Sequence, residues 1–214
     1  MKQSYYLYKS GRLQRKDNTK KSIPVERVDD IYVMTELDFN TSLLNFLSQF
    51  GINVHFFNYY GFYTGTYYPK ESLVSGKLLI KQVEHYNDKE KRLNIAKAFI
   101  EAASYNIYRN LTYYNNRGKD LKDYMTEIDY LRKQIKLCKD VPELMGIEGN
   151  IRKVYYDSWN IIINQDIAFE KRVKNPPDNA INSLISYVNT IIYTRVLSEI
   201  YKTQLNPTIS YLHE

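Results

Sequence analysis

The chain of 214 residues has one cysteine, Cys138, and no long uncharged apolar run. A single cysteine cannot close a disulfide within the chain or supply a cysteine cluster for zinc, and this usage fits a reducing cytosol. The mean hydropathy of −0.52 and the lack of a continuous apolar stretch argue against a membrane-spanning helix. The N-terminus, MKQSYYLYKSGR, has no apolar segment of the kind found in signal peptides. We therefore expect a cytoplasmic protein without a membrane partner.

Several catalytic motifs are also missing. The sequence has no Gly-rich phosphate loop, no nucleophile elbow and no pair of histidines four residues apart. The net charge of +6 is moderate, and many proteins with such a charge bind no polyanion, so nucleic-acid binding is only one possibility. Tyrosine can stack on bases, but the 22 tyrosines are better explained for the most part by low genomic GC content.

The first 69 residues read as a β-rich region. Short apolar and aromatic runs alternate with turn residues, and we expect strands at Tyr5–Tyr8, Ile31–Met34 and Ile52–Phe57. The turn at Ser10-Gly11 would return the first strand, and the glycine-interrupted stretch NYYGFYTGTYYP suits a hairpin edge. A short helix is expected in NTSLLNFLSQFG, capped by Asn40 or Thr41.

After Pro69 the spacing becomes helical. Helices are expected over 71–86, 89–116, 121–137, 142–168 and 181–196. In the second of these we expect one inward face, formed by Ala96, Phe99, Ala103, Ile107 and Leu111. The last helix is strongly apolar and is expected to be central. The predicted fold class is therefore α+β, with a small β-rich N-terminal domain (residues 1–69) followed by an all-α C-terminal domain (residues 70–214).

The stretch LMGIEGNIRKVYY places a carboxylate, Glu148, among apolar residues. Burying a carboxylate is costly unless it is paired, hydrogen-bonded or bound to a metal. The alternative is an exposed glutamate near a helix start, where the helix dipole favours it. Gly146 and Gly149 could let a ligand approach closely or could simply mark an irregular helix start. Arg152 lies one turn on and could pair with Glu148 or bind a phosphate.

The histidines leave several interpretations open. His55 falls in a buried-type strand and is expected to be a satisfied core or near-surface residue, and His85 follows a charged helix face and is expected to be solvated. His213 follows a turn that begins with proline, and it could share a divalent ion with Glu148, although spacing alone does not favour this. The run that contains Arg172 and Lys174 is either a solvated face or part of a phosphate-binding surface.

Three segments taken in order are more specific: LMGIEGNIRKVYY, RVKNPPDNAINSLISY and LNPTISYLHE. Together they resemble the consecutive motifs of the CRISPR-associated integrase family, the metal-dependent endonucleases that insert new spacers into CRISPR arrays. INVHFFNYYGFYTGTYYP and ESLVSGKLLIKQVEHY resemble the last strands of that family's β-domain and its first helix. The resemblance runs through the whole chain, and its ordered pattern is specific although each segment alone is weak.

The resemblance implies a catalytic site in which Glu148 and His213 are ligands of Mg²⁺ or Mn²⁺. It implies supporting positions near that site at Asn182, Ser186 and Tyr187. That Arg152, Arg172 and Lys174 hold the DNA backbone is our own inference. The family's third ligand is an aspartate beyond the LHE motif, so we expect the 214 residues to lack it. Whether this chain is active alone stays open, and apolar surface is expected on the helix over 181–196.

The implied partners are DNA, as spacer precursor and CRISPR repeat, a second copy of the chain joined through the β-rich domain, and a small companion protein of the adaptation complex. Two alternatives remain. One is a structure-selective DNA-binding module without catalysis, and the other is a scaffold whose tyrosine-rich surface binds only protein.

Overall fold

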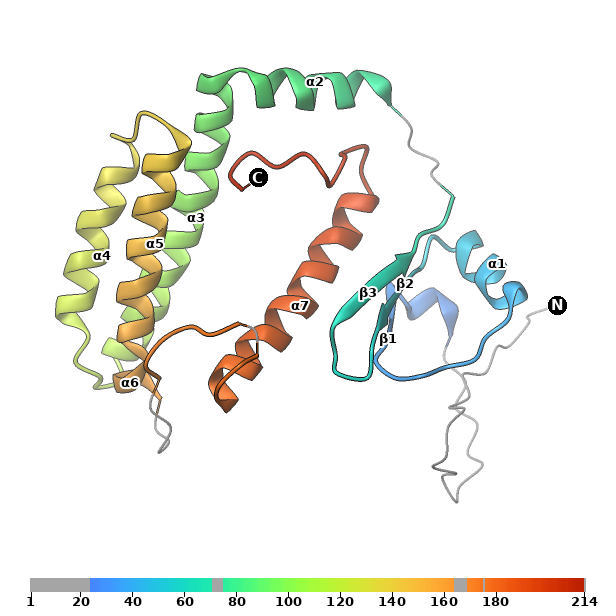
Figure 1. Cartoon of the computed structure of the whole chain (residues 1–214), viewed down its shortest axis with the longest axis horizontal. Coiled ribbons are helices and arrows are strands. Elements are labelled where there is room, and N and C mark those ends of the chain that lie inside the picture. Colours follow the sequence, from blue (N-terminus) through green and yellow to red (C-terminus); the bar gives the residue numbers. More distant parts are fainter. Residues whose placement is uncertain (1–23, 71–74, 164–168, 175, 214) are drawn as a thin grey trace. The chain divides into compact units, whose positions relative to one another are not determined.

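The computed structural model describes residues 24–70, 75–163, 169–174 and 176–213. These residues form one three-stranded sheet and a series of helices (Figure 1). The predicted α+β class is confirmed. The strand expected at Tyr5–Tyr8 and the turn that follows it lie outside the described residues. Among the described residues, no helix combines the length and the apolar character that a membrane span requires.

The chain divides into two compact units. The first combines the described part of Met1–Ser75 with Tyr187–Gln204, and the second combines Gly76–Ser186 with the described part of Leu205–Glu214. The domains expected over residues 1–69 and 70–214 therefore differ from the observed units, because a late segment of the chain belongs to the first unit. The dimerisation and catalytic roles of the two domains stay predictions.

The first unit is built on β1 (Asp30–Val33), β2 (Asn53–Phe57) and β3 (Tyr63–Tyr67). β1 and β2 are parallel and are joined through α1 (Thr41–Gln49), whereas β2 and β3 form an antiparallel hairpin. The predicted cap of α1 is confirmed, since the Asn40 side chain accepts a 3.0 Å hydrogen bond from the Leu43 N–H. A single 3-10 turn, η1 (Val25–Arg27), precedes β1. The small core is formed by Val33, Leu47, Ile52 and Val54.

The second unit contains α2 (Gly76–Asn87), α3 (Lys89–Asn115), α4 (Lys122–Ile135), α5 (Val141–Asp157) and the single turn α6 (Trp159–Ile162). α3, α4 and α5 lie side by side around one apolar core (Figure 1). The chain turns after α3 at Gly118, whose φ of 87° is a conformation that glycine adopts without strain. The buried core residues are Ala96, Ile100, Leu111, Leu121, Ile128, Leu131, Ile135, Cys138, Leu144, Ile151 and Val154.

The inward face predicted for α3 needs correction. On α3, Phe99 is 56% exposed and Ala103 is also exposed, while Ser104 is buried. The inward face is thus rotated from the predicted one, and it accepts Ser104 because the Ser104 hydroxyl donates to the carbonyl of Glu101 at 3.0 Å.

The helix predicted over residues 142–168 is too long at its C-terminal end. α5 stops at Asp157, and after α6 the backbone of Ile163 is extended. The side chain of Asn160 explains the change of direction, because its amide pairs with both backbone groups of Phe169, each at 2.9 Å. This pairing holds Phe169 against α6, so Phe169 does not continue the helix.

The last helix, α7 (Ala180–Tyr201), differs most from its expected environment. We predicted a central apolar helix, but Leu184 is 62% exposed and Ile192 is 55% exposed. Its buried positions include the polar side chains Asn182, Thr194 and Ser198. The expectation of a central helix is therefore wrong in this chain, whereas the exposed apolar surface expected on it is present.

Candidate functional site

α5 carries Glu148, and its start is fixed by local hydrogen bonds. Asp140 caps the helix by accepting from the Glu143 N–H at 2.8 Å, and the Glu143 carboxylate accepts from the Lys139 N–H at 2.8 Å. Leu144 and Ile151 are buried in the bundle core, and Glu148 falls between them on the same side of the helix. The helix therefore directs the carboxylate toward the packed side of α5.

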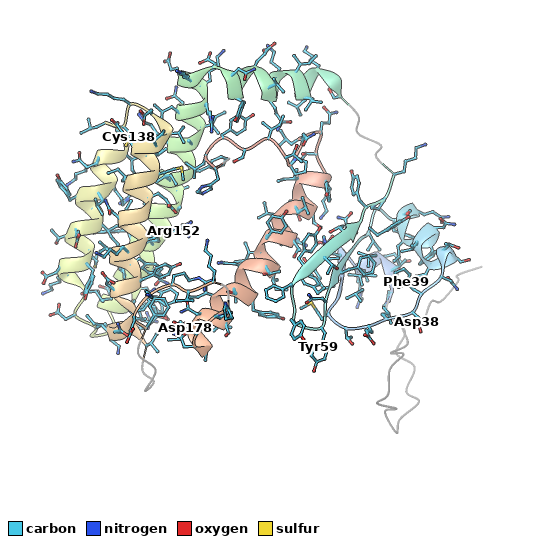
Figure 2. The ribbon with its side chains drawn as sticks, viewed as in Figure 1. Asp38, Phe39, Tyr59, Cys138, Arg152 and Asp178 are labelled. Atoms are coloured by element: carbon cyan, nitrogen blue, oxygen red, sulfur yellow. The ribbon has the colours of Figure 1, made fainter. Side chains whose placement is uncertain are left out.

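Glu148 is not an exposed helix-start residue. α5 begins at Val141, so Glu148 lies two turns inside the helix. Its side chain is only 16% exposed, whereas the side chain of Arg152 is 56% exposed. The guanidinium Nε of Arg152 donates to the Glu148 carboxylate, which realises the pairing that the sequence suggested (Figure 2 labels Arg152 on α5).

The glycines beside Glu148 do not loosen the helix. Gly146 and Gly149 both have helical backbones. A Cβ atom placed on either would meet no heavy atom of the described residues outside its immediate neighbours within 4 Å. In the part of the chain that the structure describes, no segment outside α5 comes within 4 Å of these two positions, so they are not sites of close backbone packing.

A second group of predicted residues is brought together by Arg172. Its guanidinium donates to the Asn182 side-chain oxygen at 3.1 Å and to the Ser186 hydroxyl at 2.7 Å. Asn182 is fully buried and also donates to Asp178 at 2.6 Å. Arg172 therefore fastens the segment before α7 onto the start of that helix. Sequence reasoning predicted these residues separately and did not predict this contact.

The other predicted positions lie at the surface. Lys174 is exposed, and Tyr187 is 50% exposed on α7. The DNA-binding role of Arg172 and Lys174 and the supporting role of Tyr187 stay predictions. The structure assigns Arg172 a structural role as well, because its guanidinium is already engaged by Asn182 and Ser186.

His213 lies in the C-terminal segment of the second unit, and its side chain is exposed. It lines an open pocket of about 310 Å³ together with Val83 and Tyr86 of α2 and with Thr208, Ile209 and Ser210. The side chain of Gln82 on α2 pairs with the backbone of Asn206 in this segment. Sequence reasoning missed Gln82 and Asn206, and only the turn around Pro207 gave a signal there.

The donors for a metal ion are incomplete in the described residues. A carboxylate oxygen and an imidazole nitrogen suit Mn²⁺ or Mg²⁺ in type. Glu148 and His213 belong to the same compact unit. No group of three or more His, Cys, Asp or Glu side chains in the described ranges could hold a metal. The two predicted ligands thus fit the ion chemically but do not form a complete set.

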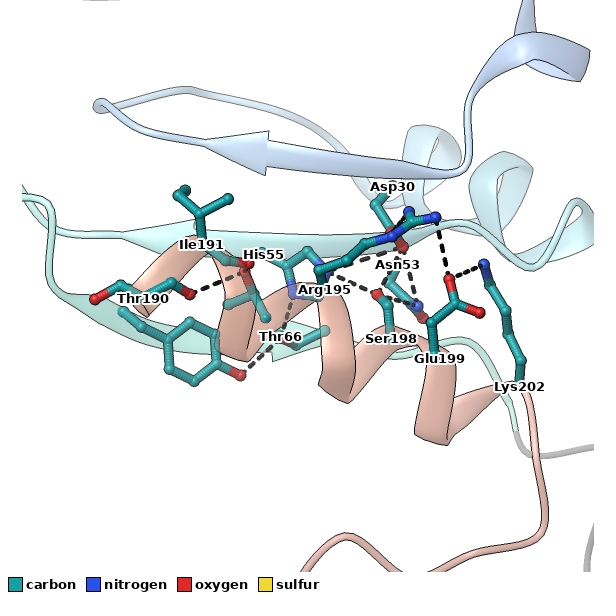
Figure 3. A network of polar contacts seen from close by, with 12 residues as sticks. Asp30, Asn53, His55, Thr66, Thr190, Ile191, Arg195, Ser198, Glu199 and Lys202 are labelled. Carbon is teal, nitrogen blue, oxygen red and sulfur yellow. Dashed lines mark hydrogen bonds and ion pairs between the residues drawn. The ribbon is translucent and has the colours of Figure 1, made fainter. Parts of the chain in front are cut away.

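His55 is buried and is a structural residue, as predicted. Figure 3 shows His55 of β2 between Thr66, whose hydroxyl is 2.8 Å from Nδ1, and Ser198, whose hydroxyl is 3.0 Å from Nε2. Ser198 donates in turn to Asp30 at 2.7 Å. Burial lowers the pKa of His55, although the carboxylate of Asp30 acts in the opposite direction. The neutral ring therefore joins α7 to the sheet.

Comparison with known proteins decides the family. A family model described as CRISPR associated protein Cas1 matches residues 3–214. The chain belongs to the Cas1 family. It is 65% identical over 223 residues to a CRISPR-associated endonuclease Cas1 of Fusobacterium nucleatum, matching 100% of this chain and 66% of that protein. It is 48% identical to a second such endonuclease, of Thermodesulfovibrio yellowstonii, with 100% of this chain and 67% of the relative covered. The chain thus spans about two-thirds of the length of these relatives.

Solved structures agree with the Cas1 assignment. A CAS1 protein of Thermotoga maritima superposes with a TM-score of 0.77 at 41% identity, covering 97% of this chain and 66% of that one. A casposase bound to an integration product superposes with a TM-score of 0.79 over 95% of this chain and 58% of its own, but at 22% identity this shows the fold alone.

Proposed function

We propose that this Cas1 chain forms the larger part of a DNA endonuclease and integrase that inserts new spacers into CRISPR arrays. The observation that carries the proposal is the family match over residues 3–214, together with 65% identity to a protein named as a CRISPR-associated endonuclease. In the proposed transesterification, the 3′-OH of the incoming DNA attacks a phosphate at the repeat end. A new phosphodiester bond forms, and the 3′ oxygen of the cleaved strand leaves with the proton.

The proposed reaction needs no protein nucleophile, which agrees with the absence of a nucleophile motif in the sequence. Glu148 and His213 would hold a Mn²⁺ or Mg²⁺ ion, which supplies Lewis acidity at the scissile phosphate when bound. Arg152 contacts the Glu148 carboxylate. Its guanidinium would therefore hold a substrate phosphate next to the ion that Glu148 would bind. Lys174 and the accessible part of Arg172 would hold the DNA backbone without reading sequence.

The proposed partners follow from the family. They are spacer-precursor and repeat DNA, a second copy of this chain, and a small companion protein. A protein of the same fold has been solved in a Cas6-RT-Cas1–Cas2 complex, with a TM-score of 0.67 at 19% identity. That likeness is one of fold, and its partner motivates the companion protein that we propose here. Two protomers related by a two-fold axis suit a reaction made at two DNA ends.

The test measures cleavage of branched DNA and strand joining to repeat DNA by the full-length gene product with Mn²⁺. Glu148→Ala and His213→Ala should each lower both rates by at least about a hundredfold, because a lost ligand removes several kcal/mol of transition-state stabilisation. Glu127→Ala on α4 and His85→Ala on α2 are matched controls that change the same residue types at other sites. Wild-type rates in both ligand variants would refute the proposal.

The same assay separates the alternatives. Salt-sensitive DNA binding without cleavage by the full-length protein would favour the structure-selective binding module. No DNA binding at low salt would favour the protein-binding scaffold. An aspartate encoded after His213 would complete the ligand set.

A further inference from the structure

The segment 205–213 carries His213 but contains no helix or strand of its own. Figure 1 shows it passing beside α2 toward α3, all within the second unit. A segment without regular structure has few internal hydrogen bonds, so its position depends on contacts with its neighbours. Side chains of α2 and α3 supply these contacts.

Gln82 makes the most specific of these contacts. Its Nε2 donates to the Asn206 carbonyl at 3.3 Å, and its Oε1 accepts from the Asn206 N–H at 2.9 Å. Gln82 is only 7% exposed, although it lies on a mostly exposed helix. A side-chain amide offers one donor and one acceptor side by side, and here both are used on one residue of the partner segment.

The turn that follows Asn206 is fixed by local hydrogen bonds. The side-chain oxygen of Asn206 accepts from the Thr208 N–H at 2.8 Å and from the Thr208 hydroxyl at 2.6 Å. The Ser210 hydroxyl then accepts from the His213 N–H at 3.2 Å. One group of local hydrogen bonds thus fixes the turn after Asn206, the residue that Gln82 holds, and a second one fixes the backbone of His213 to Ser210.

Further contacts support the far end of the segment. The Tyr211 hydroxyl donates to the backbone carbonyl of Gln82 at 3.3 Å, and its own carbonyl accepts from Nε of Arg92 at 3.0 Å. The Arg92 guanidinium lies 4.4 Å from the centre of the Tyr86 ring, which restricts its orientation. Leu212 packs against the bundle core, to which α5 contributes. His213 is therefore held next to a residue anchored in the same core as the helix of Glu148.

We propose that Gln82 is a positioning residue for His213 and acts through the backbone of Asn206. This inference rests on the proposed function, in which His213 is a ligand, but its structural part can be tested without the metal. A leucine at position 82 would fill the same space and would leave the backbone groups of Asn206 unpaired. A glutamate would keep the acceptor for the Asn206 N–H and lose the donor, so it should restore part of the effect.

The experiment uses NMR of the 214-residue chain. Only three histidines give ring signals, and His55 belongs to the first unit and serves as an internal control. In Gln82→Leu the Asn206 N–H should exchange with solvent on the order of tenfold faster, because it loses a partly buried hydrogen bond. The His213 ring signals should shift while those of His55 do not. Gln82→Glu should give smaller changes, and Lys77→Ala, at an exposed position of α2, should give none.

Unchanged His213 signals and unchanged Asn206 exchange in Gln82→Leu would overturn the positioning role. If that variant does not fold, as reported by Trp159 fluorescence, Gln82→Glu replaces it, because it loses only the Nε2 donor to the Asn206 carbonyl. It should then shift the His213 signals while those of His55 stay unchanged, and no shift would overturn the proposal.

Mn²⁺ added to the wild-type chain separates this inference from the proposed function. Paramagnetic broadening of the His213 ring signals, reduced in Gln82→Leu, supports both. If Mn²⁺ leaves the wild-type signals sharp, the 214-residue chain does not bind the ion at His213, while the metal-free exchange and shift data still decide whether Gln82 positions it. Equal broadening in wild type and Gln82→Leu would contradict the positioning role.

Discussion

The α3–α5 bundle and helix α7 differ in the side chains that they bury. In the bundle the interior is aliphatic, with residues such as Leu111, Ile128 and Leu144 fully buried. On α7, Thr194 and Ser198 are fully buried, and several apolar residues face outward. The bundle is thus stabilised by the removal of apolar surface from water, and α7 is held to a large degree by directional hydrogen bonds.

This difference explains why the bundle can be stabilised by many combinations of apolar neighbours, whereas α7 requires specific hydrogen-bond partners. An apolar side chain can pack against many neighbours, but a buried hydroxyl or amide is stable only where its hydrogen bonds are made. Ser198 satisfies that demand through His55 and Asp30. At the start of α7, Asn182 satisfies it through Arg172 and Asp178. Each end of α7 is therefore held in place by a few specific hydrogen bonds.

The largest effect is expected in the bundle core. Leu144→Ala should lower the free energy of unfolding of the second unit by about 3–5 kcal/mol, because it removes a fully buried side chain and leaves a cavity. Trp159, the only tryptophan, reports unfolding of this unit by fluorescence. The buried thiol of Cys138 should also react faster with a thiol reagent. Met145→Ala, at the exposed neighbouring position, is the control, and an equal loss in both variants would contradict the core assignment.

A smaller loss is expected from the polar contact between α7 and the sheet. The side chain of Asp30 is 1% exposed and accepts from Ser198, Asn53 and Arg195. Asp30→Ala should destabilise the first unit by about 2–3 kcal/mol, because buried donors lose their acceptor. The readout is denaturant titration of the His55 ring signals, with the Trp159 transition unchanged. Asp29→Ala, at the exposed preceding position, should be nearly neutral, and a similar neutrality at Asp30 would show that the contact is not stabilising.

The sequence predicted the bundle better than it predicted α7, for a physical reason. Helical periodicity located α3, α4 and the start of α5, because apolar residues there lie on the buried side. The same rule misplaced the buried face of α7, since its buried positions include polar side chains. Asn182 is buried because it pairs with Arg172 and Asp178 just before the helix, and Ser198 because it pairs with His55 and Asp30, far away in the chain. The site shows the same contrast. Glu148 and His213 came from motifs, whereas Gln82 carried no motif signal, because its role is defined only by the backbone of Asn206.

The burial of His55 should make the stability of the first unit depend on pH. Burial lowers the pKa of His55 from its ordinary value of 6.5, so the unfolded chain takes up a proton there before the folded chain does. The contribution of His55 to stability should be complete above pH 6.5 and should be lost as the pH falls below that value toward the folded-state pKa. Asp30, which faces the ring with Arg195 beside it, opposes this change.

The measurement is the unfolding free energy of the first unit between pH 7.5 and lower values, in wild type and in His55→Gln. The difference between the two slopes isolates the histidine from other titrating groups. We expect a steeper loss in wild type on acidification. A steeper loss in His55→Gln would mean that the folded state prefers the charged ring, contrary to the prediction.

The smallest effect on stability is expected on the outer side of α7. Ile192 is 55% exposed, so Ile192→Ser removes little buried surface and should change the unfolding free energy by no more than about 0.5 kcal/mol. It should nevertheless reduce self-association of the 214-residue chain, measured by light scattering against concentration, because exposed apolar patches promote association. Thr194→Val is the matched change on the buried side, where the Thr194 hydroxyl donates to the Ile191 carbonyl at 2.9 Å. Because valine has nearly the same shape and position 194 is buried, Thr194→Val should leave self-association unchanged. A fall in light scattering in Ile192→Ser alone would assign the association to the outward apolar face, whereas equal scattering in both variants would exclude that face as its cause.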